Sequence, residues 1–180
     1  MSPHGPGSVF CDVHALAPAG RRGGWISAQR KRTAGNGVVI DASNITRRLW
    51  IGGEPPDCDL PDFDVLVLCA QEIQPRRPEL KFHGLTIHCP LPDAQLGTDK
   101  IRIALMGGHR VAQELVAGNR VLVTCAMGRN RSALVAGFGM AKIYRLSPGT
   151  IIETIRRRRH PDCLSNPHFV QLLGKYSVRH

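Results

Sequence analysis

The stretch "VLVTCAMGRNRSALVAG", residues 121–137, places a polar turn between two apolar segments. The β-branched run before Cys125 predicts a buried strand. The small and apolar residues after Ser132 predict a helix of the core. Gly128 permits the backbone angles that a tight loop needs. A strand, a short loop and a helix in succession are typical of an α/β fold.

The loop itself, residues 126–131, has the composition of an anion-binding site. Successive backbone N–H groups at a helix N-terminus converge on one concavity, where the helix dipole is positive. Arg131 can add a planar fork of donors that suits two oxygens of a phosphate. A thiol at the mouth of this cradle, that of Cys125, is expected to ionise more readily than a free cysteine. These features predict a phosphate-transfer site with a cysteine nucleophile.

Periodic segments on both sides of this stretch extend the same pattern. Short apolar runs bounded by Gly, Pro, Asp or Asn predict strands: "GVVI" (37–40), "RRLWIGG" (47–53), "FDVLVLCA" (63–70), "GLTIHC" (84–89) and "NRVLVTC" (119–125). Helical patterns cover four later segments: 98–118 with a Thr98 cap and a stop at Gly118, 131–144, 147–159 with Ser147 as cap and Pro148 at the first position, and 165–176. We expect a single α/β domain with a central, mostly parallel sheet of about five strands flanked by helices.

Residues 1–36 differ from the rest of the 180-residue chain. They are rich in Gly, Pro, Ala and Arg and lack sustained periodicity, so we predict a flexible basic extension ahead of a catalytic domain at 37–180. The formal net charge of the whole chain is +10, with an excess of basic residues in both parts. This charge predicts attraction to anions.

Composition excludes several other classes of protein. No apolar stretch reaches the roughly 18 residues of a membrane helix, and no secretory leader is recognisable, so we expect a soluble, cytoplasmic protein without a membrane span. The six cysteines include no C-x-x-C pair, which argues against a zinc site. A chain of this length can fold without disulfides, so we expect reduced thiols. Cys69, within "VLVLCAQ", resembles a small core residue.

The segment "CAMGRNRS", residues 125–132, fits the C-x5-R-[ST] loop of the cysteine-dependent phosphatases. It most resembles the dual-specificity branch of the protein tyrosine phosphatase superfamily. The resemblance implies that Cys125 attacks phosphorus, that Arg131 clamps the phosphoryl oxygens and that the Ser132 hydroxyl helps the cysteine leave. The phosphate would be cradled by the backbone N–H groups of Ala126, Met127, Gly128, Arg129, Asn130 and Arg131.

The resemblance also implies a general acid, which in dual-specificity members is an aspartate on a loop roughly thirty residues before the cysteine. Asp93, in "CPLPDAQLGTDK", stands at that position. Asp99 is the competing candidate, but it suits the first turn of the following helix better. The segments "ITRRLWIGGEPP" and "RRRRHPDCLSNPHFVQLL" resemble the family's early strand and C-terminal stretch, so the resemblance covers about residues 44–178.

Two departures from the family bear on activity. Thr124 stands where the family usually has a histidine, which predicts weaker activity of Cys125 rather than none. No segment resembles the long loop by which the tyrosine-specific enzymes grip phosphotyrosine. We therefore expect a metal-independent enzyme without cofactors that acts on phosphotyrosine, and also on phosphoserine and phosphothreonine, in protein substrates.

Other hypotheses remain open at this point. The substrate could be the 5′ end of triphosphorylated RNA, because RNA triphosphatases share this loop and a basic chain suits a polyanion; the low aromatic content (5%) and the lack of a recognised RNA-binding motif argue against nucleic acid. A pseudophosphatase that binds phosphorylated partners without turnover is a second alternative, and a nucleic-acid-binding tail is a third.

Several side chains near these motifs have less specific interpretations. We expect Arg156 to Arg159 to form a solvated helix end, and Asn130 to stiffen the loop through backbone contacts. His88 is expected to be structural. Cys89 is a candidate for a reversible disulfide with Cys125.

Overall fold

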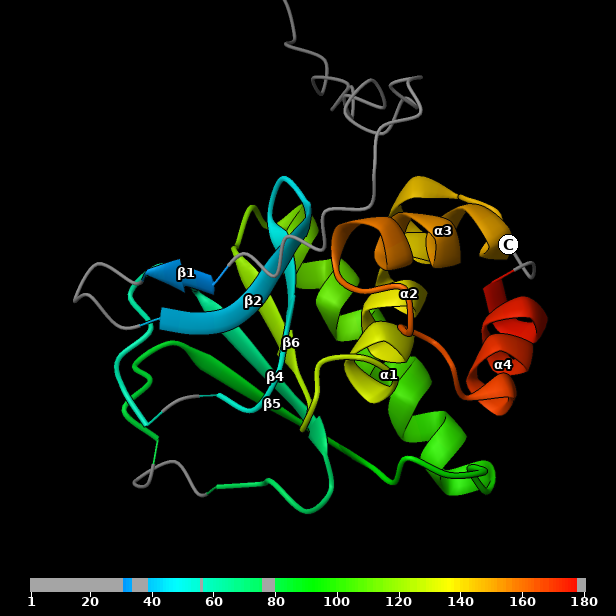
Figure 1. Cartoon of the computed structure of the whole chain (residues 1–180), viewed down its shortest axis with the longest axis horizontal. Helices are drawn as coiled ribbons and strands as arrows, with labels where there is room; N and C mark the ends of the chain where they lie inside the picture. Colours follow the sequence, from blue (N-terminus) through cyan, green and yellow to red (C-terminus); the bar gives the residue numbers. More distant parts are fainter. Residues whose placement is uncertain (1–30, 34–38, 56, 76–79, 178–180) are drawn as a thin grey trace, which may run out of the picture.

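A computed structural model describes residues 31–33, 39–55, 57–75 and 80–177. Its centre is a six-stranded sheet in the order β1-β2-β3-β6-β4-β5 (Figure 1). The strands are β1 Lys31–Thr33, β2 Val39–Thr46, β3 Leu49–Gly52, β4 Val65–Ala70, β5 Leu85–Leu91 and β6 Val121–Thr124. Each of the five predicted strand segments contains or overlaps one of β2 to β6.

Strand pairing is mixed, with a parallel centre. β6 pairs in parallel with β3 on one side and with β4 on the other, and β4 pairs in parallel with β5. β2 is antiparallel to β3, and β1 is antiparallel to β2. This confirms the predicted α/β fold with a mostly parallel sheet. Because β3, β4, β5 and β6 run in one direction, their carboxyl ends meet at the same edge of the sheet.

The short strand β1 lies within the segment that the sequence predicts to be an extension. Its three residues pair with Val39, Ile40 and Asp41 of β2, so they are part of the sheet. The remainder of that segment, residues 1–30 and 34–36, lies outside the described residues.

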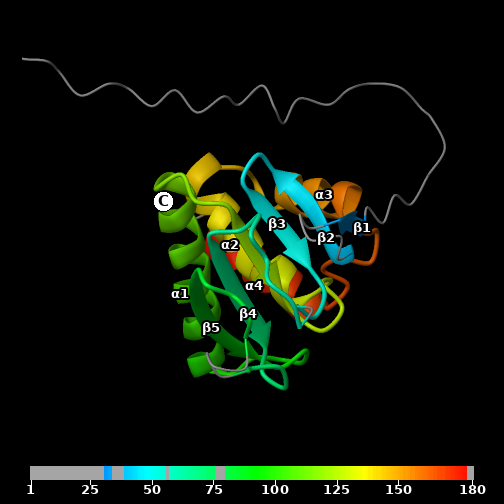
Figure 2. The ribbon, with the colours of Figure 1, turned by 90° about the vertical axis from the view of Figure 1, so that its left-hand side faces the viewer.

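Four helices follow the pattern of the sequence: α1 Thr98–Val116, α2 Arg131–Tyr144, α3 Pro148–Arg158 and α4 Pro167–Ser177. In the part of the chain that the structure describes, all four lie on one face of the sheet (Figures 1 and 2). None of them is long and apolar enough to cross a membrane.

The helix caps agree with the sequence in one case and differ in another. Ser147 caps α3, because its hydroxyl accepts a hydrogen bond from the Thr150 amide at 3.2 Å. The predicted Thr98 cap of α1 is wrong. Gly97 has the extended backbone of a capping residue, and Thr98 is already the first helical residue. The stop near Gly118, which has a φ of +90°, is confirmed.

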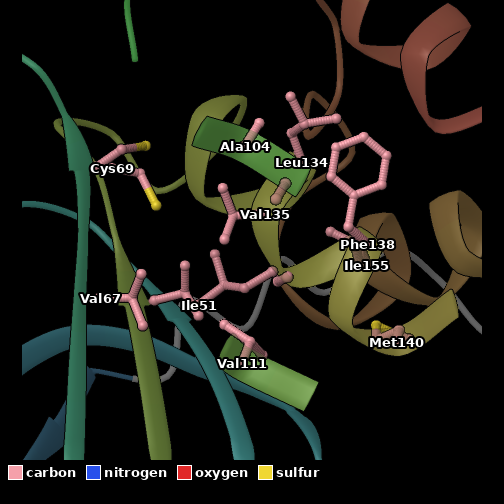
Figure 3. Packing of buried hydrophobic residues seen from close by; sticks show 14 of the residues in the cluster. Ile51, Val67, Cys69, Ala104, Val111, Leu134, Val135, Phe138, Met140 and Ile155 are labelled. Atoms are coloured by element: carbon pink, nitrogen blue, oxygen red, sulfur yellow. The ribbon is translucent and has the colours of Figure 1, made fainter. Parts of the chain in front are cut away.

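The main core lies between the sheet and the helices, with α2 at its centre (Figure 3). Residues 131–141 of α2 are all buried, because the helix packs against the sheet, α1, α3 and α4. Cys69 is fully buried in this core, as predicted. The opposite face of the sheet is covered by loops rather than helices: Leu60, Phe63 and Phe82 pack there around Trp50.

Candidate active site

The polar loop of the opening stretch joins β6 to α2 at the carboxyl edge of the parallel strands. Gly128 has a φ of +62°, which disfavours any other residue. A Cβ there would lie 2.5 Å from the carbonyl carbon of Gly52. The loop is therefore packed tightly against the end of β3.

Cys125 lies at the start of the loop, and only 4% of its surface is exposed. Its Sγ lies 3.2 Å from the hydroxyl oxygen of Ser132, the second residue of α2. The structure thus brings together the predicted nucleophile and the predicted hydroxyl. The preceding residue, Thr124, donates its hydroxyl to the Val67 carbonyl of β4 at 3.2 Å, so this side chain is used within the sheet.

Arg131 is buried and reaches back over the loop. Its Nη1 donates to both carboxylate oxygens of Glu72 at 2.6 Å and to the Leu91 carbonyl at 3.3 Å. Its Nε is buried and has no hydrogen-bond partner among the residues that the structure describes. An unpaired buried donor is costly, so this nitrogen is suited to receive an acceptor from a ligand.

The ion pair with Glu72 fixes the charge of both groups. Burial alone would lower the pKa of Arg131, but the hydrogen bond to Glu72 and the nearby Cys125 and Asp93 outweigh it and raise this pKa. The same hydrogen bond holds the pKa of Glu72 below its ordinary value. A permanent positive charge therefore lies beside the Cys125 thiol.

Asp93 is held at the site by two amides. One carboxylate oxygen accepts a hydrogen bond from Nδ2 of Asn130 at 3.2 Å, and the other accepts from Nδ2 of Asn166 at 3.4 Å. The Oδ1 of Asn130 in turn accepts from the backbone N–H groups of Ser165 and Asn166. The prediction that Asn130 bonds to backbone is confirmed, and it also contacts Asp93. Asp99 lies instead in the first turn of α1.

These groups surround a cavity of about 440 Å³. Its lining residues are Asp93, Cys125, Met127, Arg129, Asn130, Arg131, Asp162 and Ser165. None of them is aromatic. Met127 is 61% exposed at the rim, and Arg129 pairs with Asp162 at 3.5 Å. The cavity is polar, large enough for a phosphate with part of its alcohol, and open to the Cys125 thiol.

The prediction that the arginines ending α3 form a solvated helix end is correct for Arg156 and Arg157, which are exposed. It is wrong for Arg159, which is 9% exposed. It forms a bidentate ion pair with Asp41, with both distances 2.7 Å. It also donates to the carbonyls of Met127 and Gly128. A buried charge persists only when it is paired, and Asp41 lies on β2, far from Arg159 in sequence.

Sequence reasoning missed three functional candidates: Glu72, Asn166 and Arg159. For Glu72 there was a usable signal, since it lies two residues after the end of β4, and the carboxyl end of β4 meets that of β6 at one edge. Asn166 was missed because its sequence position already had another explanation. It caps the N-terminus of α4, where its Oδ1 accepts a hydrogen bond from the His168 amide.

The other polar groups near the site have structural roles. His88 contacts Gln74 at 2.7 Å on the surface, and the Cys89 thiol donates to the Ile103 carbonyl. The five described cysteines, which are Cys58, Cys69, Cys89, Cys125 and Cys163, are free thiols. Among the residues that the structure describes, no group of three or more His, Cys, Asp or Glu side chains could hold a metal ion.

Comparison with known proteins gives a result at the level of the fold. No family model and no curated sequence matches the chain. A solved structure of Tk-PTP in the active form superposes on 77% of this chain and 97% of its own, with a TM-score of 0.67 and 21% identity. Human DUSP28 gives 78% and 95% coverage, a TM-score of 0.63 and 19% identity. The chain has the fold of the dual-specificity phosphatases.

This fold does not by itself decide the activity. A human tyrosine phosphatase-like serine/threonine/tyrosine-interacting protein has it too, with a TM-score of 0.61, 20% identity and coverage of 75% of this chain and 94% of its own. The activity therefore depends on the side chains at the β6–α2 loop.

Proposed function

We propose that this protein is a metal-independent phosphatase that hydrolyses phosphomonoesters through a phosphocysteine intermediate. The observation that carries the proposal is the buried, unpaired Nε of Arg131 beside the Cys125 thiol, in a cavity at a helix N-terminus. A tetrahedral oxyanion supplies the acceptor that this nitrogen lacks, and the helix dipole favours its negative charge.

The first step forms the bond between sulfur and phosphorus. The Cys125 thiolate attacks phosphorus, and the bond from phosphorus to the ester oxygen breaks. Asp93 gives its proton to that departing oxygen, so that a neutral alcohol leaves. The N–H groups of the loop and the Arg131 guanidinium bind the equatorial oxygens, where charge is spread in the transition state.

The second step returns the enzyme to its starting state. Water attacks phosphorus while the Asp93 carboxylate accepts a proton from it. The sulfur–phosphorus bond breaks, and inorganic phosphate leaves. The Ser132 hydroxyl, 3.2 Å from Sγ, donates a hydrogen bond to the departing thiolate. This hydrogen bond supplies part of the stabilisation of the Cys125 thiolate that a histidine in place of Thr124 would give.

The lining of the cavity supports a broad range of phosphorylated side chains. A phosphotyrosine ring would have Met127 as its main apolar neighbour and no aromatic partner among the lining residues. The site therefore has little means of selecting an aryl group over an alkyl group. We propose phosphotyrosine, phosphoserine and phosphothreonine of proteins as substrates.

The test is hydrolysis of para-nitrophenyl phosphate in EDTA and a reducing agent, with wild type beside Cys125→Ser. We expect turnover in the wild type and none in the variant, and a phosphocysteine adduct that acid quenching traps only in the wild type. Absence of turnover in both would contradict the proposal on small substrates. Phosphate release from 5′-triphosphorylated RNA and stoichiometric binding of phosphopeptides would then distinguish the two alternatives.

A further inference from the structure

The carbonyl groups of the β6–α2 loop are held from outside the cavity. The Ala126 carbonyl accepts a hydrogen bond from the Glu54 amide at 3.2 Å, and the Arg129 carbonyl accepts from the Leu164 amide at 3.1 Å. The two carbonyls between them, those of Met127 and Gly128, both accept from Arg159, at 3.3 Å and 3.1 Å. Four consecutive carbonyls thus have fixed directions.

Fixed carbonyls imply fixed N–H groups. In a trans peptide unit the C=O and the following N–H point in opposite directions, and the described chain contains no cis peptide bond. The N–H groups of residues 127, 128, 129 and 130 therefore point away from these four donors. We expect these N–H groups to face the cavity, which Met127, Arg129 and Asn130 line. Two of the four depend on a single side chain, that of Arg159.

Arg159 is built to hold this position. Its Nε donates to the Gly128 carbonyl, and its Nη2 donates to both Met127 and Asp41. Its Nη1 donates to Asp41 and lies 3.4 Å from the Ser43 hydroxyl. A Cβ on Gly128 would lie 2.5 Å from Nη2, so the guanidinium packs directly against the loop backbone.

We infer that Arg159 is a positioning residue, which turns the N–H groups of Gly128 and Arg129 into the cradle while Asp41 anchors it to β2. This inference rests on the proposed function, because the cradle has a use only if it binds an oxyanion. Arg159 touches no reacting atom and acts through the loop. Lysine cannot replace it, because one ammonium nitrogen cannot reach two carbonyls and a carboxylate from fixed positions.

The primary test measures anion binding rather than turnover. In the Cys125→Ser protein, calorimetry gives the affinity for tungstate, a tetrahedral oxyanion that resembles phosphate. We expect Arg159→Lys in that background to weaken the affinity at least tenfold. The matched control is Arg157→Lys, an exposed arginine in the last turn of the same helix, and we expect its affinity to stay within twofold. Thermal unfolding establishes that each variant is folded.

Turnover supplies a second readout that a purely structural role would not move. With Cys125 present, Arg159→Lys is expected to lower kcat/KM for para-nitrophenyl phosphate at least tenfold at a temperature where it is fully folded. Folded Arg159→Lys protein with wild-type tungstate affinity and wild-type kcat/KM would overturn the inference. If Arg159→Lys does not fold, the same two measurements are made on Asp41→Asn, which keeps the shape of the side chain that anchors Arg159 and removes its charge.

The two proposals fail in different ways. Normal turnover in the wild type with no effect of Arg159→Lys overturns the positioning role alone. Tungstate binding that Arg159→Lys weakens, in a protein without turnover, supports the positioning role and contradicts the enzyme. Absence of tungstate binding to Cys125→Ser overturns the cradle and, with it, the role of Arg159.

Discussion

Each side of the β6–α2 loop has one buried arginine, and each arginine forms an ion pair with a carboxylate. Arg131 faces the cavity and pairs with Glu72, while Arg159 lies behind the loop and pairs with Asp41. The exposure is the same in both pairs: 6% for each arginine side chain and 52% for each carboxylate partner. What differs is the use of the guanidinium nitrogens.

All three nitrogens of Arg159 donate hydrogen bonds to protein atoms. Within the described part of the chain, Arg131 donates only through Nη1, and its Nε is buried without a partner. A buried arginine with every nitrogen engaged supports the backbone around it. A buried arginine that keeps an unpaired N–H donor beside a cavity can donate that hydrogen bond to a ligand. Burial and charge alone would not separate these roles, but the donor count does.

The largest expected effect comes from the cavity side. Arg131→Lys should lower kcat/KM for para-nitrophenyl phosphate by about 10³-fold, because an ammonium cannot provide two directed donors to the transition state. Its free energy of unfolding should change little, because the half-exposed Glu72 carboxylate stays solvated. Steady-state kinetics and urea unfolding on the same preparation check both. A large loss of stability with normal kinetics would show that Arg131 supports the fold rather than binding the substrate.

Behind the loop, the larger expected effect is on the stability of the fold, in addition to the loss of turnover expected above. Arg159→Gln should lower the free energy of unfolding by about 3 kcal/mol, mainly because it leaves two loop carbonyls without donors. Urea denaturation measures this, with the exposed Arg157→Gln as control. If Arg159→Gln lowers the free energy of unfolding no more than Arg157→Gln does, the loop keeps its shape without Arg159.

If Asp93 is the general acid, as proposed, its substitution should affect some substrates more than others. Asp93→Asn is expected to lower kcat about 100-fold on alkyl phosphates, whose alcohol leaves poorly without a proton. Para-nitrophenol leaves readily as an anion, so the loss there should be smaller. Asn166→Ala, which removes one of the two amides that hold Asp93, should lower kcat on alkyl phosphates less than Asp93→Asn does. Equal losses on both substrates would argue that Asp93 binds rather than donates a proton.

The smallest effect concerns the pH dependence of the Arg131–Glu72 pair. The hydrogen bond to Arg131 lowers the pKa of Glu72, so the pair stabilises the fold above the ordinary carboxyl range. This stability is lost as pH falls through the lowered folded value. Because Glu72 is half exposed, the difference in unfolding free energy between wild type and Glu72→Gln should be below about 1 kcal/mol at pH 7. Urea unfolding between pH 7 and pH 3 should show this difference in unfolding free energy disappear as the pH falls. A difference that stays constant would contradict a stabilising ion pair between Arg131 and Glu72.

Local pattern was sufficient for most of the fold. Alternating and continuous apolar runs located β4 and β6, and the Ser147–Pro148 pair located the start of α3. In the site, the order of Cys125, Gly128 and Arg131 along one loop carried the prediction, because a strand, a loop and a helix place neighbouring residues around one point. The Thr98 cap was wrong because two adjacent residues could begin α1, and only the backbone angles decide between them.

The partners of the site could not be read in the same way. Glu72 is 59 residues from Arg131, and Asp41 is 118 residues from Arg159. Each pairing depends on how strands are ordered in the sheet, which local periodicity does not contain. An Arg-rich helix end looks solvated in sequence, and only the packing of α3 against β2 makes Arg159 a buried residue.

The Asn130 amide has a thermodynamic consequence. Its nitrogen donates to Asp93, and its oxygen accepts from Ser165 in the α3–α4 connection. Its backbone is part of the proposed cradle. If occupancy of the cradle changes the free energy of docking the Asp93 loop, docking must change the affinity of the cradle by the same factor. A substitution of Ser165, whose hydroxyl bonds to the Asn130 amide oxygen, would then alter both equilibria together.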